Sequence, residues 1–205
     1  MSKILENKLL KKESLMSKAF DLFVKNGIHK TSISDIANEA GVAKGTFYLY
    51  FKDKYDINNK IIKHKSSEVF SKALDELKTQ DIEAFDDRVI FVINSIIDQL
   101  NKNKNLLKLI SKNLSWGIFK SVLFIDDSSD DINFMQVYNE MILGNDIEFD
   151  EPEIMLFMIV ELVSSTCYSS ILYREPREID ELKPYLYKSI RNIIDSHKIT
   201  KQIKP

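Results

Sequence analysis

Apolar residues recur along the chain at the three- and four-residue spacing of amphipathic helices. In the N-terminal part this pattern predicts a first helix that ends at Gly27, which suits a left-handed C-terminal cap. Its apolar face is formed by Leu15, Met16, Ala19, Leu22 and Phe23. A short second helix begins within TSISDIANEA, residues 31–40, where Thr31 or Ser32 can serve as the N-cap. Asp35 follows Ser32 at the spacing of a capping box.

A third helix is predicted for KGTFYLYF, residues 44–51, after a turn at Gly41. Phe47 and Phe51 lie one helical turn apart, and we expect both in the core. Asp53 is the expected N-cap of a long fourth helix. Two short helices joined by a tight glycine turn predict a helix-turn-helix unit.

The rest of the chain is also helical in pattern. Further helices are predicted at 83–101, 104–113, 115–125, 132–143, 152–174 and 178–197. The fold class is therefore all-α, with an N-terminal three-helix helix-turn-helix domain joined by a long helix to a larger helical domain. We place the boundary within the fourth helix, giving domains at 1–55 and 56–205.

Composition narrows the class of protein. Five glycines and four prolines in 205 residues disfavour an all-β fold. The single cysteine, Cys167, excludes an internal disulfide and multi-cysteine metal sites, and fits a cytoplasmic location. The N-terminus is too polar for a signal peptide, and we expect no membrane span, metal or cofactor. Cys167 would sense oxidants only if it were exposed with a lowered pKa.

Charge divides the chain into two parts. Residues 1–65 hold 13 lysines and 7 acidic residues, a net charge of +6, whereas the remainder has a net charge of −8. A basic head on an acidic body suggests that the head meets a polyanion. The alternative is ordinary surface lysine.

Residues 41–54, GVAKGTFYLYFKDK, combine hydroxyls, glycines and lysines around the two phenylalanines. Lys44, Gly45 and Thr46 occupy the exposed first turn of the third helix, where free N–H groups favour an anionic partner. Lys54 begins the fourth helix, where the helix dipole disfavours a cation unless an external anion docks there.

The segment TSISDIANEAGVAKGTFYLYFKDK, preceded by SLMSKAFDLFVKNG, resembles the DNA-binding domain of the TetR family (AcrR-like) of bacterial transcriptional regulators. The resemblance covers roughly residues 11–60. It departs from the family at Ala43, where many members carry a capping serine, and the absence of this cap would cost the third helix about 1 kcal/mol.

The resemblance implies that the third helix enters the major groove of a double-stranded DNA operator. It assigns DNA contacts to Thr31, Ser32, Ser34, Lys44, Gly45, Thr46, Tyr48, Tyr50, Lys52 and Lys54. Phosphate contacts would set affinity, and base contacts would set sequence preference. Residues 1–65 contain no arginine, so bidentate guanine readout by arginine is not expected from this head.

The resemblance also implies a homodimer built on the final helix pair and a small-molecule effector that releases DNA. The expected interface residues are Leu162, Ser165, Leu172, Leu182, Leu186, Ile190 and Ile193; the alternative is that these stripes close the monomer core. The candidate pocket residues are Trp116, Phe119, Tyr138, Glu161 and Tyr168. Each aromatic could equally be ordinary core, and Glu161 could be buried, ion-paired or at an exposed edge.

The leading hypothesis is a dimeric repressor of palindromic operators, released by a small apolar or amphipathic molecule. A regulator controlled by a protein partner, or an activator without a ligand, is the alternative. We expect no enzyme, because His29, His64 and His197 are far apart in sequence and no nucleophile or phosphate-loop motif is present.

Overall fold

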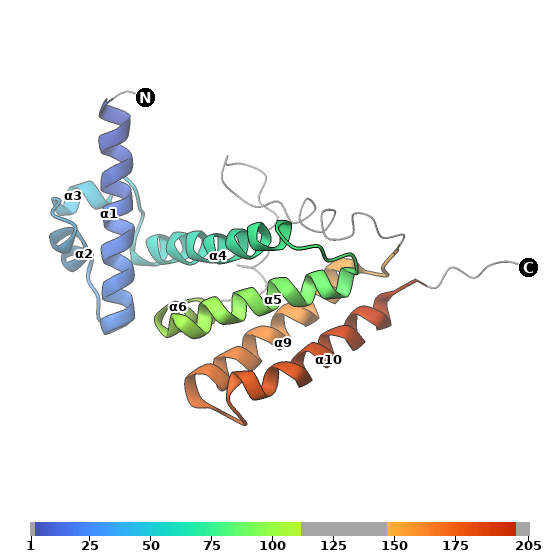
Figure 1. Ribbon diagram of the computed structural model, residues 1–205. Coiled ribbons are helices and arrows are strands. Elements are labelled where there is room, and N and C mark those ends of the chain that lie inside the picture. The colour runs from blue at the N-terminus through green and yellow to red at the C-terminus, as the bar shows by residue number, and fades with distance from the viewer. Residues whose placement is uncertain (1–2, 112–146, 200–205) are drawn as a thin grey trace, which may run out of the picture. The chain divides into compact units, whose positions relative to one another are not determined.

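The computed structural model describes residues 3–111 and 147–199, and every regular element in these two ranges is a helix (Figure 1). The helices are α1 (Lys3–Asn26), α2 (Ile33–Glu39), α3 (Lys44–Phe47), α4 (Lys54–Lys78), α5 (Phe85–Lys102), α6 (Lys104–Ser111), α9 (Pro152–Tyr173) and α10 (Ile179–His197). The chain forms two compact units, Met1–Lys65 and Ser66–Pro205, and α4 begins in the first and ends in the second. The expected all-α class is confirmed.

The first unit has its core where the apolar pattern predicts it. Leu15 and Ala19 of α1 are fully buried, and Phe23 is nearly so. The helix ends where Gly27 adopts a φ of +80° and donates its N–H to the carbonyl oxygen of Phe23 at 3.0 Å. A left-handed residue of this kind caps the free carbonyls of the last turn, as the sequence indicates.

The capping box expected for α2 is present. Ser32 Oγ accepts the N–H of Asp35 at 3.1 Å, and the Asp35 carboxylate accepts the N–H of Ser32 at 2.9 Å. The pKa of Asp35 is lowered first by the side-chain and then by the backbone hydrogen bond of Ser32. These bonds fix the start of α2 because they satisfy two N–H groups that no helical carbonyl can reach.

The helix α3 is shorter than the predicted 44–51. Regular α-helix ends at Phe47, and residues 48–50 continue as turns, with the N–H groups of Tyr50 and Phe51 both directed at the Phe47 carbonyl at 3.0 Å. The N-cap position holds Ala43, whose side chain makes no capping bond. A missing cap and a run of aromatic residues both weaken a short helix, which explains the early end.

In the second unit, α5, α9 and α10 pack against one another, and α6 packs on α5 and α9. The bounds of α5, α6, α9 and α10 agree with the predicted ranges within two residues. The predicted helices at 115–125 and 132–143 lie outside the described residues. An antiparallel bridge joins Phe149, before α9, to Lys198, after α10.

Polar ties hold α10 to α5. Lys183 Nζ lies 2.6 Å from Asp98 Oδ1, and the Tyr187 hydroxyl donates to Asn94 Oδ1 at 2.6 Å. Arg191 pairs with Asp86 and Asp87 at the start of α5. Burial opposes the charged form of Lys183, but its bonds to two aspartates prevail and raise the pKa.

Candidate nucleic-acid interface

The core beneath α2 and α3 decides which side chains face solvent. Ile36, Ala37, Phe47 and Phe51 are buried, and the rings of the two phenylalanines have centroids 5.4 Å apart. Their burial turns the other side of the α2–α3 unit outward. The outward residues include Ser32, Lys44, Gly45 and Lys52, which are exposed, and Tyr48, which is 53% exposed.

Gly45 lies on this outward side in open space. A Cβ atom built on Gly45 would have no neighbouring heavy atom within 4 Å, and its φ is not in the left-handed region. Neither the packing nor the backbone of the described chain therefore requires glycine here. Gly41 differs, because its φ of +68° is one that other residues adopt at a cost.

The structure corrects the expected DNA contact of Thr31. Its side chain is 1% exposed, and Oγ1 donates to the carbonyl oxygen of Gly27 at 2.9 Å and lies 3.4 Å from that of Leu22. The hydroxyl therefore closes the end of α1 instead of pointing into solvent. A side chain held in this way is not available to a phosphate, so Thr31 leaves the proposed contacts.

The remaining serine and threonine residues, Ser32, Ser34 and Thr46, lie near the outward face to different degrees. Ser32 is exposed but its oxygen already serves the capping box. Ser34 and Thr46 are half-buried, and Thr46 lies in the middle of α3. Tyr50 is also half-buried.

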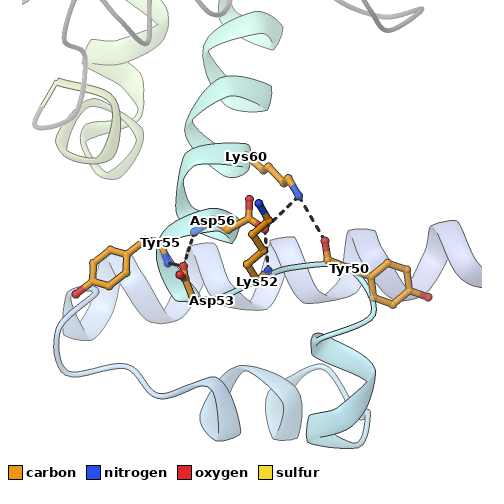
Figure 2. Close-up of polar contacts among 6 residues, drawn as sticks. All are labelled: Tyr50, Lys52, Asp53, Tyr55, Asp56 and Lys60. Atoms are coloured by element: carbon orange, nitrogen blue, oxygen red, sulfur yellow. Dashed lines mark hydrogen bonds and ion pairs between the residues drawn. The ribbon is translucent and has the colours of Figure 1, made fainter.

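The junction between α3 and α4 is held by two aspartates (Figure 2). Asp53 Oδ1 accepts the N–H groups of Tyr55 and Asp56, both at 2.8 Å, which makes Asp53 the N-cap expected from the sequence. Asp56 Oδ2 accepts the N–H of Lys52 at 2.9 Å. The aspartates thus fix the backbone on both sides of Lys54.

Lys60 completes this junction from one turn further along α4. Its Nζ lies 3.2 Å from Asp56 Oδ2, donates to the Tyr50 carbonyl at 3.4 Å, and lies 5.2 Å from the centroid of the Phe51 ring (Figure 2). Burial raises the pKa of Asp56, but the Lys52 N–H and the Lys60 ammonium outweigh it, so the pKa is lowered overall. Asp56 is therefore anionic at neutral pH.

Lys54 has partners within its own unit. Its Nζ donates to the carbonyl oxygens of His29 at 3.1 Å and Thr31 at 3.2 Å. These bonds provide a structural reason for a cation at the start of a helix, beside the external anion expected from the sequence. An ammonium has three N–H donors, so one remains for a further partner.

Sequence reasoning did not assign a role at the interface to Lys60, Tyr55 or Leu49. Tyr55 is 50% exposed, and Leu49 is 75% exposed beside Tyr48. The four-residue spacing of Asp56 and Lys60 was a usable signal, because such pairs face each other on a helix. Nothing in the local pattern distinguishes Leu49 from a core leucine.

The expected effector pocket is described only in part. Trp116, Phe119 and Tyr138 lie outside the described residues. Glu161 is exposed on α9, which agrees with the exposed-edge alternative. Tyr168 is half-buried, with its hydroxyl 3.4 Å from that of Tyr173.

The expected interface residues fall into three groups. Leu186 and Ile190 are buried within the chain, so for these two the monomer-core alternative holds. Leu162, Ser165 and Leu182 line, together with Leu186, an open groove of about 370 Å³ between α9 and α10. The last two residues, Leu172 and Ile193, are half-buried.

Cys167 cannot be the exposed redox sensor considered from the sequence. It is 1% exposed, and burial raises its pKa to about 12. Within residues 3–111 and 147–199 no group of histidine, cysteine and acidic residues is arranged to hold a metal ion.

The fold and the α2–α3 site define a helix-turn-helix protein. Residues 15–60 match the family described as bacterial regulatory proteins, tetR family. The chain thus carries a helix-turn-helix segment of this family's type. It is 38% identical over 64 residues to the fatty acid metabolism regulator protein of Bacillus subtilis, covering 31% of this chain and 33% of that protein. It is also 38% identical over 50 residues to the transcriptional regulator AcrR of Shigella flexneri, covering 24% of this chain and 23% of that protein.

The chain thus spans about a third or less of the length of these curated relatives. Solved structures match much more of it. The fatty acid degradation regulator FadR of Bacillus halodurans covers 88% of this chain, with 94% of its own length matched, a TM-score of 0.62 and 17% identity. FadR of Bacillus subtilis in complex with stearoyl-CoA covers 87% of this chain, with 96% of its own length matched, a TM-score of 0.63 and 20% identity. At these identities the likeness shows the fold. The relatives are named as transcriptional regulators, not as enzymes.

Proposed function

We propose that the protein is a dimeric repressor that binds a palindromic DNA operator and is released by a small molecule. The observation that carries the proposal is the outward face of α3, where Gly45 lies in open space beside exposed Lys44 and Tyr48. A glycine that the chain does not need for its own packing suits close approach of another backbone. The head that presents it has a net charge of +6, which suits a polyanion.

On this proposal the contacts divide by chemistry. Lys44, Gly45, Thr46 and Ser34 lie at the major groove. The phosphate backbone is held by Ser32, Tyr48, Tyr50, Lys52 and Lys54. No arginine is present in the head, so sequence preference rests on Lys44, Thr46, the tyrosines and the shape of the duplex.

The proposed homodimer forms on α9 and α10. One helix-turn-helix buries little groove surface, and a two-fold pair reads both halves of a palindrome. On α9, Ile154, Phe157 and Met158 are 50%, 38% and 36% exposed, and on α10 Tyr185 is 70% exposed. By length and composition α9 could also cross a membrane, with 28% of its apolar window buried. In the proposed dimer a second copy of the chain covers this apolar face, so the face requires no other partner.

For the effector we propose an apolar or amphipathic molecule bound in the second unit. FadR of Bacillus subtilis was solved with stearoyl-CoA, which makes long-chain acyl-CoA the first class to test. Control by a protein partner is the second candidate, supported by the same exposed face of α9 that supports the dimer.

The test measures equilibrium binding of the purified protein to the DNA upstream of its own coding region. Binding is monitored by fluorescence anisotropy at several salt concentrations. We expect an inverted repeat that binds at least a thousand-fold more tightly than random duplex, as is usual for specific sites. Addition of acyl-CoA chains of increasing length should then release the DNA. Equal affinity for upstream and random DNA at moderate salt would contradict a repressor of its own region.

A further inference from the structure

The helix α1 extends well beyond the part that packs in the first unit. It begins at Lys3, whereas its first fully buried residue is Leu15. Figure 1 shows these first turns, in dark blue, projecting past α2 and α3. Lys8, Lys11 and Lys12 in this extension are exposed, and among the described residues their side chains form no hydrogen bond or ion pair.

The three lysines lie on the face of α1 that becomes core further along. Lys8, Lys11 and Lys12 precede Leu15 by seven, four and three residues, which places them within about 60° of Leu15 around the helix axis. Leu15 and Ala19 on that face are buried within the first unit. The same stripe of α1 is therefore apolar where the unit covers it and basic where the helix projects.

The contact between α1 and the end of α2 places this basic stripe next to the turn that leads into α3. Ser14 Oγ lies 3.5 Å from the carbonyl oxygen of Ala40, the C-cap of α2. Lys44, the first residue of α3, follows four residues after Ala40. Lys11 lies one helical turn before Ser14, so the stripe begins beside the turn that leads into α3.

We propose that Lys8, Lys11 and Lys12 bind phosphates of the operator duplex that flank the segment contacted by α3. The proposal rests on the DNA-binding function proposed above and extends its footprint. From Lys8 to Lys12 the helix rises about 6 Å, a length over which one strand of B-DNA presents about two phosphates. The contacts carry no sequence information, so they raise affinity for all duplexes long enough to reach them.

A lipid surface is the competing partner, because Leu5, Leu9 and Leu10 in the same extension are 55%, 49% and 56% exposed. Around the helix, however, Glu6 and Glu13 lie between Leu9 and Leu10 on the side away from the lysines. Two carboxylates inside the apolar face oppose insertion among acyl chains and repel an anionic membrane. The arrangement therefore favours DNA.

The experiment compares K8Q/K11Q/K12Q with the matched control K102Q/K104Q/K108Q, which removes three exposed lysines from α5 and α6. Glutamine keeps the helix propensity of lysine, and circular dichroism checks that both variants fold alike. Binding is measured on the operator trimmed to its repeat and on the same operator extended by about ten base pairs on each side, which is about one turn of the duplex. Salt is varied so that the slope of log K against log salt is obtained.

On the extended duplex we expect the α1 variant to lower the slope by about 0.9 for each phosphate that it no longer binds, which for two phosphates is about 1.8 per protomer. The control variant should keep the wild-type slope, and on the trimmed duplex the α1 variant should approach the wild type. An α1 variant with the wild-type slope on the extended duplex overturns the inference while leaving the repressor proposal intact. Lysine-dependent sedimentation with anionic phospholipid vesicles, without a change in DNA binding, also overturns it. Failure of the wild type to prefer its operator would overturn the proposed function itself.

Discussion

The side-chain ammonium of Lys54 donates to the carbonyl oxygen of Thr31 at 3.2 Å, and so joins the first residue of α4 to the residue before the N-cap of α2. The second carbonyl it reaches, that of His29, lies in the same loop. The loop before α2 is therefore held by a side chain that was expected from the sequence to meet DNA.

Replacing Lys54 should consequently have two effects. For Lys54→Ala we expect a loss of about 1–2 kcal/mol in the free energy of unfolding, because two hydrogen bonds from a charged group are removed. We also expect the salt slope of DNA binding to fall by about 0.9 per protomer, because the third N–H is free for a phosphate. Urea unfolding and anisotropy measure the two effects separately. The matched control is Lys52→Ala, whose exposed side chain should change the slope and leave stability within about 0.5 kcal/mol. Lower stability with an unchanged slope would make Lys54 purely structural.

Gly45→Ala should stabilise the fold and weaken DNA binding, whereas Lys54→Ala should weaken both. Open space surrounds the position, so alanine should raise the free energy of unfolding by about 0.5–1 kcal/mol through helix propensity. The added methyl group should weaken operator binding if a DNA backbone approaches there. Gly41→Ala is the control, since its φ of +68° makes alanine destabilising. Undiminished operator affinity in Gly45→Ala would rule out close approach at this position.

Because of Asp56, the stability of the first unit should depend on pH in the acidic range. Its pKa in the folded chain is lowered from the ordinary 3.8, so its contribution to stability is complete above that value and is lost as the pH falls through the folded pKa. Asp56→Asn should therefore cost about 1 kcal/mol at pH 7 and progressively less toward pH 2. Urea unfolding across this range makes the comparison, with exposed Glu39→Gln as control. A cost that stays constant over the whole range would mean that the carboxylate charge is not what holds Lys52 and Lys60.

Cys167 should be inert in the folded protein. With a pKa of about 12 and 1% exposure, roughly one thiol in ten thousand would be ionised at pH 8, and reagents could not reach it without local opening. Alkylation by a maleimide should proceed at least a hundred-fold more slowly in the native protein than in 6 M urea, where a buried thiol becomes accessible. Rapid labelling of the native protein would show that α9 opens readily.

Ser165→Arg should disrupt the proposed homodimer without unfolding the chain. Ser165 is exposed and lines the groove between α9 and α10, so an arginine there adds bulk and charge where a second copy would pack. Sedimentation equilibrium should show a shift toward monomer by at least ten-fold in the dissociation constant, a cost that an unpaired buried charge readily reaches. Asn105→Arg, exposed on α6, is the control. A dimer of unchanged strength would place the interface elsewhere.

Much of the first unit could be predicted because its determinants are local. The capping box at Ser32, the left-handed cap at Gly27 and the buried pair Phe47 and Phe51 each depend on residues a few positions apart. Lys54 could not be placed in the same way, because the carbonyls that it reaches, those of His29 and Thr31, lie 25 and 23 residues away in the sequence. Thr31 was missed for a different reason. A threonine before a helix has the same local pattern whether its hydroxyl turns inward or outward.

The second unit shows a different limit on prediction. Leu186 and Ile190 belong to the apolar stripe of α10 that was expected at the dimer interface, yet both are buried within the chain. A helical stripe indicates that a face is covered and carries no information about which chain covers it. Glu161 is the complementary case, since a single acid in an apolar helix is compatible with either a buried pair or an exposed edge.

The hydrogen bonds at the start of α4 bear on how the helix-turn-helix segment could be exchanged between proteins. The backbone of Lys52 depends on Asp56, the Tyr50 carbonyl on Lys60, and the loop at His29 and Thr31 on Lys54. A chimaera cut before Lys54 would transplant the recognition segment without the side chains that frame it. A chimaera with its junction after Lys60 would transfer the recognition segment together with the side chains that hold it.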